Sequence, residues 1–300
     1  MALIYCCLGS ESELGRVLRS SIFSRLLTRS TGSAARLPLW YRSVETGSGP
    51  CVWDTVAPHP ATITRMRVML MRTCLSDMVA PSVARATVTV LERAGVEVTV
   101  PRRQTCCGQP GWSSGHPEQA RPVARQALKA FRGDDPIVVP SGSCTAMVRH
   151  GYAELFAGRP EEAEAAEMAE RTMELTQFLS RHDLRPKPSG SGSVTHHDSC
   201  HMLRLLGERE SSRAVIGGVE GLELREMEQT DVCCGFGGTF SVNFPEVSGR
   251  LGEEKARNAA AAGADELVAC DLSCLLHIAG RARRCGIDLK VRHLAEVLAE

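Results

Sequence analysis

Residues 230–241 read TDVCCGFGGTFS and residues 104–110 read QTCCGQP, so each segment places two adjacent cysteines directly before a glycine. Each pair belongs to a set of four cysteines: one cysteine ahead of the pair, the pair itself and one cysteine behind it. The two sets are Cys74, Cys106, Cys107, Cys144 and Cys200, Cys233, Cys234, Cys274. The intervals are 32 and 37 residues in the first set and 33 and 40 in the second. Four cysteines recurring in one order indicate an internal repeat, which predicts two copies of one fold.

From residue 66 onward, short apolar segments alternate with segments of helical periodicity. The predicted strands are 67–72, 96–100, 136–139, 193–196, 222–226, 266–269 and 289–291. The predicted helices are 79–94, 117–131, 144–155, 160–181, 246–262 and 274–284. Such alternation is typical of parallel α/β units. We therefore predict an α/β protein with two pseudo-symmetric, Rossmann-like lobes, each built on a parallel sheet.

Two regions differ in composition from the rest of the chain. The segment 185–193, RPKPSGSGS, has the composition of a linker and divides the chain into domains at 66–184 and 193–300. Residues 1–65 contain arginine and serine but no lysine, and few acidic residues. This extension fits an organelle transit segment, a disordered tail or a mis-assigned start. We favour a true start at Met66, which would leave the cysteines of the extension without function.

The composition excludes several classes of function. Lysine plus arginine and aspartate plus glutamate number 35 each, so no basic excess favours nucleic-acid binding. No apolar run approaches the ~20 residues of a membrane-spanning helix. Thirteen cysteines in a chain of 300 residues suggest metal ligands or redox groups in a reducing compartment rather than a disulfide scaffold. The expected location is the cytoplasm, with any contact to the inner membrane made through partners.

The predicted strand ends carry the outer cysteines of each set. Ligands of open α/β sheets gather at the carboxyl ends of the strands, and a helix N-terminus stabilises a thiolate. Four thiolates suit an iron–sulfur cluster or zinc. Structural zinc sites usually show close CxxC pairs, and no CxxC occurs in this sequence. The pattern therefore favours iron–sulfur clusters, while zinc and metal-free thiol–disulfide chemistry stay open.

The repeated pattern resembles the CCG-type cysteine-rich domain proteins. The matching segments are QTCCGQP 104–110, PSGSCT 140–145, HDSCH 197–201, TDVCCGFGGTFS 230–241, DLSCLL 271–276 and HLAEVL 293–298. The family includes the B subunit of heterodisulfide reductase, the iron–sulfur subunit of glycolate oxidase and the C subunit of anaerobic glycerol-3-phosphate dehydrogenase. Within it, the resemblance is greatest to the lactate-utilization A proteins, and it spans about residues 66–300.

The resemblance implies a function, a cofactor and partners. It implies an iron–sulfur electron-transfer subunit of a system that oxidises L-lactate to pyruvate. The partners would be a ferredoxin-like iron–sulfur subunit and a third small subunit. The eight cysteines of the two sets would hold two clusters, which we expect to be of the [4Fe-4S] type. An alternative is direct cluster-based catalysis on a 2-hydroxy acid or a disulfide, and a further alternative is a metal-free thiol redox protein.

One departure from the family pattern concerns a fifth ligand. In the full motif the last cysteine belongs to a CxxC, but here Ser141 and Asp271 precede the last cysteines by three residues. Either could supply an oxygen ligand, and Cys270 could substitute, although a buried strand position suits it better. The histidines His196, His197 and His201 flank Cys200, where we expect packing or hydrogen bonding to a cluster sulfur rather than ligation.

Overall fold

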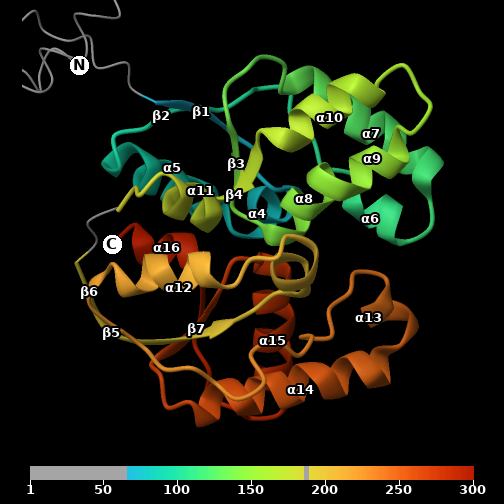
Figure 1. Ribbon diagram of the computed structural model, residues 1–300. Helices are drawn as coiled ribbons and strands as arrows, with labels where there is room; N and C mark the ends of the chain where they lie inside the picture. The colour runs from blue at the N-terminus through green and yellow to red at the C-terminus, as the bar shows by residue number, and fades with distance from the viewer. Residues whose placement is uncertain (1–65, 186–188) are drawn as a thin grey trace, which may run out of the picture. The chain divides into compact units, whose positions relative to one another are not determined.

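The computed structural model describes residues 66–185 and 189–300 (Figure 1). The expectations for residues 1–65, including the three interpretations of that extension, fall outside the described residues. The residues from 66 to 300 that the structure describes belong to one compact unit, which carries both cysteine sets. No described helix is long and apolar enough to cross a membrane.

Two four-stranded parallel sheets repeat one topology. The first has the order β2-β1-β3-β4 and the second the order β6-β5-β7-β8. The strands are β1 (Arg67–Leu70), β2 (Glu97–Thr99), β3 (Ile137–Val139), β4 (Thr172–Glu174), β5 (Ser189–His197), β6 (Glu220–Leu224), β7 (Glu266–Ala269) and β8 (Val291–His293). Because consecutive parallel strands need crossover segments, helices lie between them. The predicted fold of two repeated parallel α/β lobes is confirmed.

Helices and two π-helical turns, η3 and η4, connect the strands. Those of the first half are α4 (Cys74–Val79), α5 (Pro81–Arg93), α6 (Gln109–Ser113), α7 (Pro117–Ala130), α8 (Gly142–Ala146), η3 (Met147–Gly151), α9 (Tyr152–Leu155), α10 (Glu162–Glu170) and α11 (Leu175–Arg181). Those of the second half are η4 (His201–Leu205), α12 (Glu210–Gly217), α13 (Phe240–Asn243), α14 (Pro245–Ala261), α15 (Leu272–Arg284) and α16 (Leu294–Leu298). Proline begins α5, α7 and α14, where its missing N–H costs no helical hydrogen bond.

The two halves share one apolar core. Helix α5 packs on α16, and α11 packs on α12 (Figure 1). Because α5 is equivalent to α12 and α11 to α16 in the repeat, these two contacts are related by a pseudo-two-fold axis. The central core cluster joins side chains of both halves, including Leu91 and Phe178 with Ile216 and Leu294. Two outer clusters lie one in each half, and each contains cysteines of its own set. Burial of this shared core fixes how the two cysteine sets are placed relative to one another.

The structure differs from the sequence prediction in several details. The predicted helix 160–181 is wrong, because strand β4 divides it into α10 and α11. Thr172 is β-branched and fully buried beside β3, and the Glu174 side chain caps α11 by accepting a hydrogen bond from Thr176 N at 2.6 Å. The predicted linker 185–193 is shorter than expected, because β5 already begins at Ser189. Helix α12 was not predicted, since its short sequence offers few apolar residues.

Candidate metal centres

The first cysteine set gathers at the carboxyl edge of the first sheet. Cys74 begins α4 behind the N-cap Thr73, and Cys144 lies in α8 behind the N-cap Ser141, whose Oγ accepts from Cys144 N at 3.3 Å. The pair Cys106 and Cys107 lies in the loop before α6. The sulfur atoms of Cys74 and Cys106 are 3.4 Å apart, so residues 32 positions apart in sequence meet.

The second set repeats this arrangement. Cys200 follows β5 as the N-cap of η4, and Cys274 lies in the first turn of α15. The donor atoms of Cys234, Cys274 and His197 lie within 4.8 Å of one another. Gly235 N donates to the sulfur of Cys233 at 3.3 Å, as Gly108 N donates to that of Cys106 at 3.5 Å. The structure thus brings the cysteines together within each predicted set.

Both CCG loops require glycine at their third position. The φ angles of Gly108 and Gly235 are +91° and +89°, a left-handed conformation that side chains disfavour. A Cβ atom on Gly235 would also lie 2.5 Å from the carbonyl oxygen of Ser248 and 2.9 Å from the Cβ of Leu251. The second pair of cysteines therefore turns sharply over helix α14, and at Gly235 only glycine allows such a close approach.

Within each set, neighbouring thiols shift one another's pKa values in opposite directions. Cys107 and Cys74 lower the pKa of Cys106 to about 3, and Cys200 and Cys234 lower that of Cys233 to about 2. The pKa values of Cys74 and Cys200 rise instead, because each shares a proton with its neighbour and is partly buried. Adjacent thiols that cannot all ionise together are well suited to share a positive ion.

The Asp271 side chain forms hydrogen bonds with residues of both halves of the chain. Its carboxylate, only 2% exposed, accepts hydrogen bonds from Ser141 Oγ at 2.8 Å, Ser143 Oγ at 2.8 Å and Ser199 Oγ at 2.6 Å. It also accepts from Ser143 N at 3.1 Å. Burial raises the pKa of Asp271, but these hydrogen bonds outweigh burial and leave it below its usual value. The two candidate oxygen ligands, Ser141 and Asp271, thus bind each other.

The other candidate residues are dispersed around the second set. His197 is fully buried against the cysteines, whereas His196 lies 3.2 Å from Asp198. His201 Nε2 lies 3.0 Å from the side-chain nitrogen of Gln109, across the two halves. Cys270 lies in the shared central core with its pKa raised by burial. Cys285 ends α15 beside Glu253, outside both sets.

A cavity of about 450 Å³ opens beside the second set. Its walls include all four cysteines of that set and the loop from Phe236 to Thr239, together with Gln109 and Ser114 of the first half. Ser114 and Thr239 close one side with a hydrogen bond of 3.2 Å. None of the cavity's lining residues is a cysteine of the first set. This volume falls within the usual range of ligand sites.

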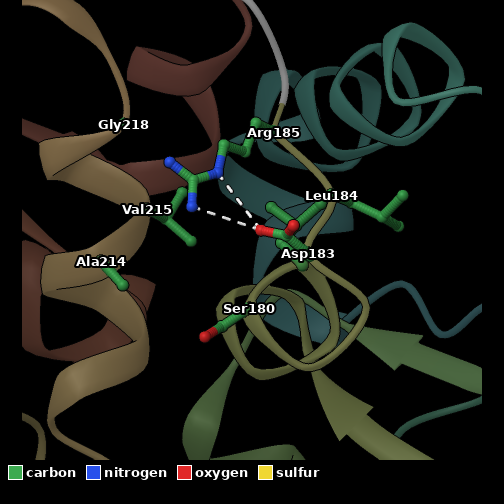
Figure 2. A pocket seen from close by; sticks show the side chains of 8 residues that line it. Ser180, Asp183, Leu184, Arg185, Ala214, Val215 and Gly218 are labelled. Atoms are coloured by element: carbon green, nitrogen blue, oxygen red, sulfur yellow. Dashed lines mark hydrogen bonds and ion pairs between the residues drawn. The ribbon is translucent and has the colours of Figure 1, made fainter. Parts of the chain in front are cut away.

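A smaller hollow of about 150 Å³ lies between the end of α11 and helix α12 (Figure 2). Arg185 donates two hydrogen bonds of 3.3 Å to Asp183 at its edge, and Ser180 and Val215 line the walls. Its lining contains no cysteine, histidine or other nucleophile beyond the serine. Of these two hollows, only the larger cavity is lined by thiols.

Sequence reasoning missed two supporting side chains. Tyr152 is buried below the first set and donates its hydroxyl to the carbonyl oxygen of Cys107 at 3.0 Å. Lys255 is buried below the second set and donates to the carbonyl oxygens of Gln229 and Thr230, just before the second pair. The one available signal was a lysine among the small residues on the buried face of α14.

The donor chemistry fits iron–sulfur clusters. Each set offers four soft thiols, and at least one thiol of each pair is drawn toward ionisation. In the second set, the described residues add one imidazole to this group. The backbone N–H groups of the two glycines already donate to thiol sulfur, as protein groups around such clusters do. The residues present therefore fit the group that the sequence predicts.

Comparison with known proteins decides the family. The model of the CCG cysteine-rich domain matches residues 68–149 and again residues 194–279. The chain belongs to the CCG cysteine-rich domain family. This membership confirms the resemblance drawn from the repeated cysteines, and each matched segment contains all four cysteines of one set.

Named relatives within the family cover most of this chain. Lactate utilization protein A of Shouchella clausii (strain KSM-K16) is 46% identical over 237 residues, which are 78% of this chain and 98% of that protein. Lactate utilization protein A of Geobacillus thermodenitrificans (strain NG80-2) is 45% identical over 237 residues, with the same coverage. A crystal structure of a hypothetical protein from Helicobacter pylori matches with a TM-score of 0.51 and 8% identity. It covers 78% of this chain and 48% of that one, and supports the fold alone.

Proposed function

We propose that this CCG-family chain is an iron–sulfur electron-transfer subunit of a system that oxidises L-lactate to pyruvate. The observation that carries the proposal is the gathering of two four-cysteine sets at equivalent sheet edges of one compact unit. The 46% identity to a protein named for lactate utilization supports the choice of substrate system. When bound, iron–sulfur clusters would supply one-electron redox chemistry.

The proposed ligands are Cys74, Cys106, Cys107 and Cys144 for one [4Fe-4S] cluster, and Cys200, Cys233, Cys234 and Cys274 for the other. Oxidation of L-lactate to pyruvate releases two electrons and two protons, and two one-electron centres match that number. The buried strand ends hold the thiols in place, and the shared core fixes the distance between the sets. In this proposal Ser141, Asp271 and Cys270 are not ligands, because the first two bind each other and the third lies in the core.

The proposed partners are a ferredoxin-like iron–sulfur subunit and a third small subunit. We place the assembly in the cytoplasm, with any contact to the inner membrane made through partners. The test mixes the anaerobically purified full chain with the candidate partner subunits and L-lactate, and follows bleaching of the cluster absorption. Bleaching only with partners supports the electron-transfer role. No bleaching with any partner, in a chain that carries iron, would contradict it.

A second candidate is direct catalysis at the second set. The cavity beside that set favours it, because Gln109, His201 and Ser143 offer hydrogen-bonding groups next to the thiols. A 2-hydroxy acid or a disulfide could reach the thiols there. Lactate-dependent bleaching of the isolated chain, without partners, would favour this candidate over the first.

A further inference from the structure

We propose that His197 donates a hydrogen bond to sulfur at the second metal centre and thereby raises the reduction potential of that centre. The inference rests on the proposed function, since it requires clusters in both cysteine sets. It concerns the difference between the two sets, which the cysteine pattern itself does not reveal.

The place of His197 points to sulfur as its partner. It is the last residue of β5, has no exposed surface, and its donor atom lies within 4.8 Å of the sulfur atoms of Cys234 and Cys274. Among the described residues, neither ring nitrogen has a hydrogen-bond partner. A buried polar group without a hydrogen-bond partner is energetically unfavourable. A neutral imidazole carries one N–H, and a thiolate or cluster sulfur beside it would accept that bond.

The matching place of the first half holds Met71, which offers no such donor. Cys74 and Cys200 are 126 positions apart, and the same step carries Met71 to His197. The strand register agrees with this match. Leu70, the residue before Met71, pairs with Val138, and His196, the residue before His197, pairs with Val268. Met71 is also buried, at 1% exposure, but a thioether can only accept hydrogen bonds weakly.

This difference has a predictable sign. Reduction adds negative charge to a cluster, so a hydrogen bond to sulfur stabilises the reduced state and raises the potential. Two charged groups, Lys255 and Asp271, also lie near the second set. Both charged groups are unchanged in variants at positions 71 and 197. Such variants therefore isolate the effect of the hydrogen bond on the potential. The donor biases electrons toward the centre beside the cavity.

The test measures both potentials in the full chain, purified without oxygen, by redox titration followed with electron paramagnetic resonance. The variants are His197→Met, which copies the first half, His197→Gln, which keeps an N–H donor, and Met71→His, which adds one. His197→Met should lower one potential by about 59 mV, a tenfold change in the reduced-to-oxidised ratio of a one-electron couple. Met71→His should raise the other potential, and His197→Gln should keep most of the original value.

Other outcomes would overturn the inference. Unchanged potentials in His197→Met, with iron content retained, would show that the imidazole does not act on the cluster. Loss of about half the iron from both His197 variants would make His197 a ligand rather than a donor. Wild-type protein without iron would overturn this inference and the proposed function together. Shifted potentials in a chain that no lactate system reduces would leave the inference standing and contradict the proposed function alone.

Discussion

The two halves of the described chain keep the same thiols and change what surrounds them. Both have the same strand order, the same cysteine set and a left-handed glycine after the adjacent pair. Buried places that differ between the first and the second half include Met71 against His197, Ala127 against Lys255, and Ser141 against Asp271. The second pairing follows from the prolines that begin α7 and α14, which align Ala127 with Lys255.

The repeat therefore preserves the cysteine ligands, while the side chains that surround them differ between the two halves. The second set has a buried imidazole, a buried ammonium group and a buried carboxylate near it, and it borders the cavity of about 450 Å³. The corresponding places of the first half are a thioether, a methyl group and a hydroxyl. Two metal centres with such different surroundings would differ in potential and in access, as a relay between two partners requires.

The largest effect is expected from removing one thiol of each pair. Cys107→Ala and Cys234→Ala should each lose about half of the bound iron and sulfide, because each empties one of two four-iron sites. Iron and sulfide analysis after anaerobic purification measures the loss. Cys270→Ala is the matched control, since that buried thiol belongs to the shared core and should retain all the iron. Equal iron in Cys107→Ala and wild type would contradict the first ligand set.

The junction between the halves should respond strongly to Asp271 and weakly to its counterpart. Asp271→Ala leaves three serine hydroxyls and one backbone N–H without their acceptor, which should cost roughly 3–5 kcal/mol of unfolding free energy. Ser141→Ala removes one donor to Asp271 and the N-cap of α8, and should cost about 1–2 kcal/mol. Urea unfolding of the metal-free chain compares the two, and Asp288→Ala, at an exposed place, serves as the control. Equal costs for Asp271→Ala and Asp288→Ala would contradict the junction.

A buried pair of helix caps should give the two halves opposite pH dependence. Glu174 caps α11 in the first half, and burial raises its pKa from its ordinary value of 4.5 to about 7. The folded state therefore holds a proton that the unfolded state releases, so this contribution to stability is present below about pH 4.5 and is lost as pH rises through 7. Glu174→Gln should gain up to about 3 kcal/mol over wild type at pH 8 and little at pH 5.

Unfolding free energies of wild type and Glu174→Gln at several pH values check this prediction. The glutamine keeps an acceptor for the cap, so the cap itself survives the substitution. A difference between the two proteins that does not vary between pH 5 and pH 8 would show that Glu174 titrates normally in the folded state.

The smallest effect is expected from the corresponding cap of the second half. His293 caps α16, and burial lowers its pKa below its ordinary value of 6.5. The unfolded state then binds more protons, so this contribution is present above pH 6.5 and is lost as pH falls. His293→Asn keeps a capping side chain but does not titrate, and should flatten the loss of stability between pH 7 and pH 5. An identical acid response in the variant and the wild type would contradict it.

Much of the fold and the ligand sets could be predicted from sequence, because both rest on repetition. Cysteine spacing reveals the repeat, and β-rich segments ahead of the cysteines place them at strand ends. Strand β4 could not be predicted, because its three residues continue a helical pattern and only pairing with β3 makes them a strand. The partnership of Asp271 with three serines depends on two lobes meeting, which no local pattern records.

The most direct test of the account is metal analysis of the full chain purified without oxygen, combined with its visible absorption spectrum. Two sets of four cysteines predict about eight iron and eight sulfide per chain, with a brown chromophore and no stoichiometric zinc. Zinc in place of iron, or metal-free protein with all thiols open to titration, would contradict the account and leave a structural or thiol-based role for the cysteines.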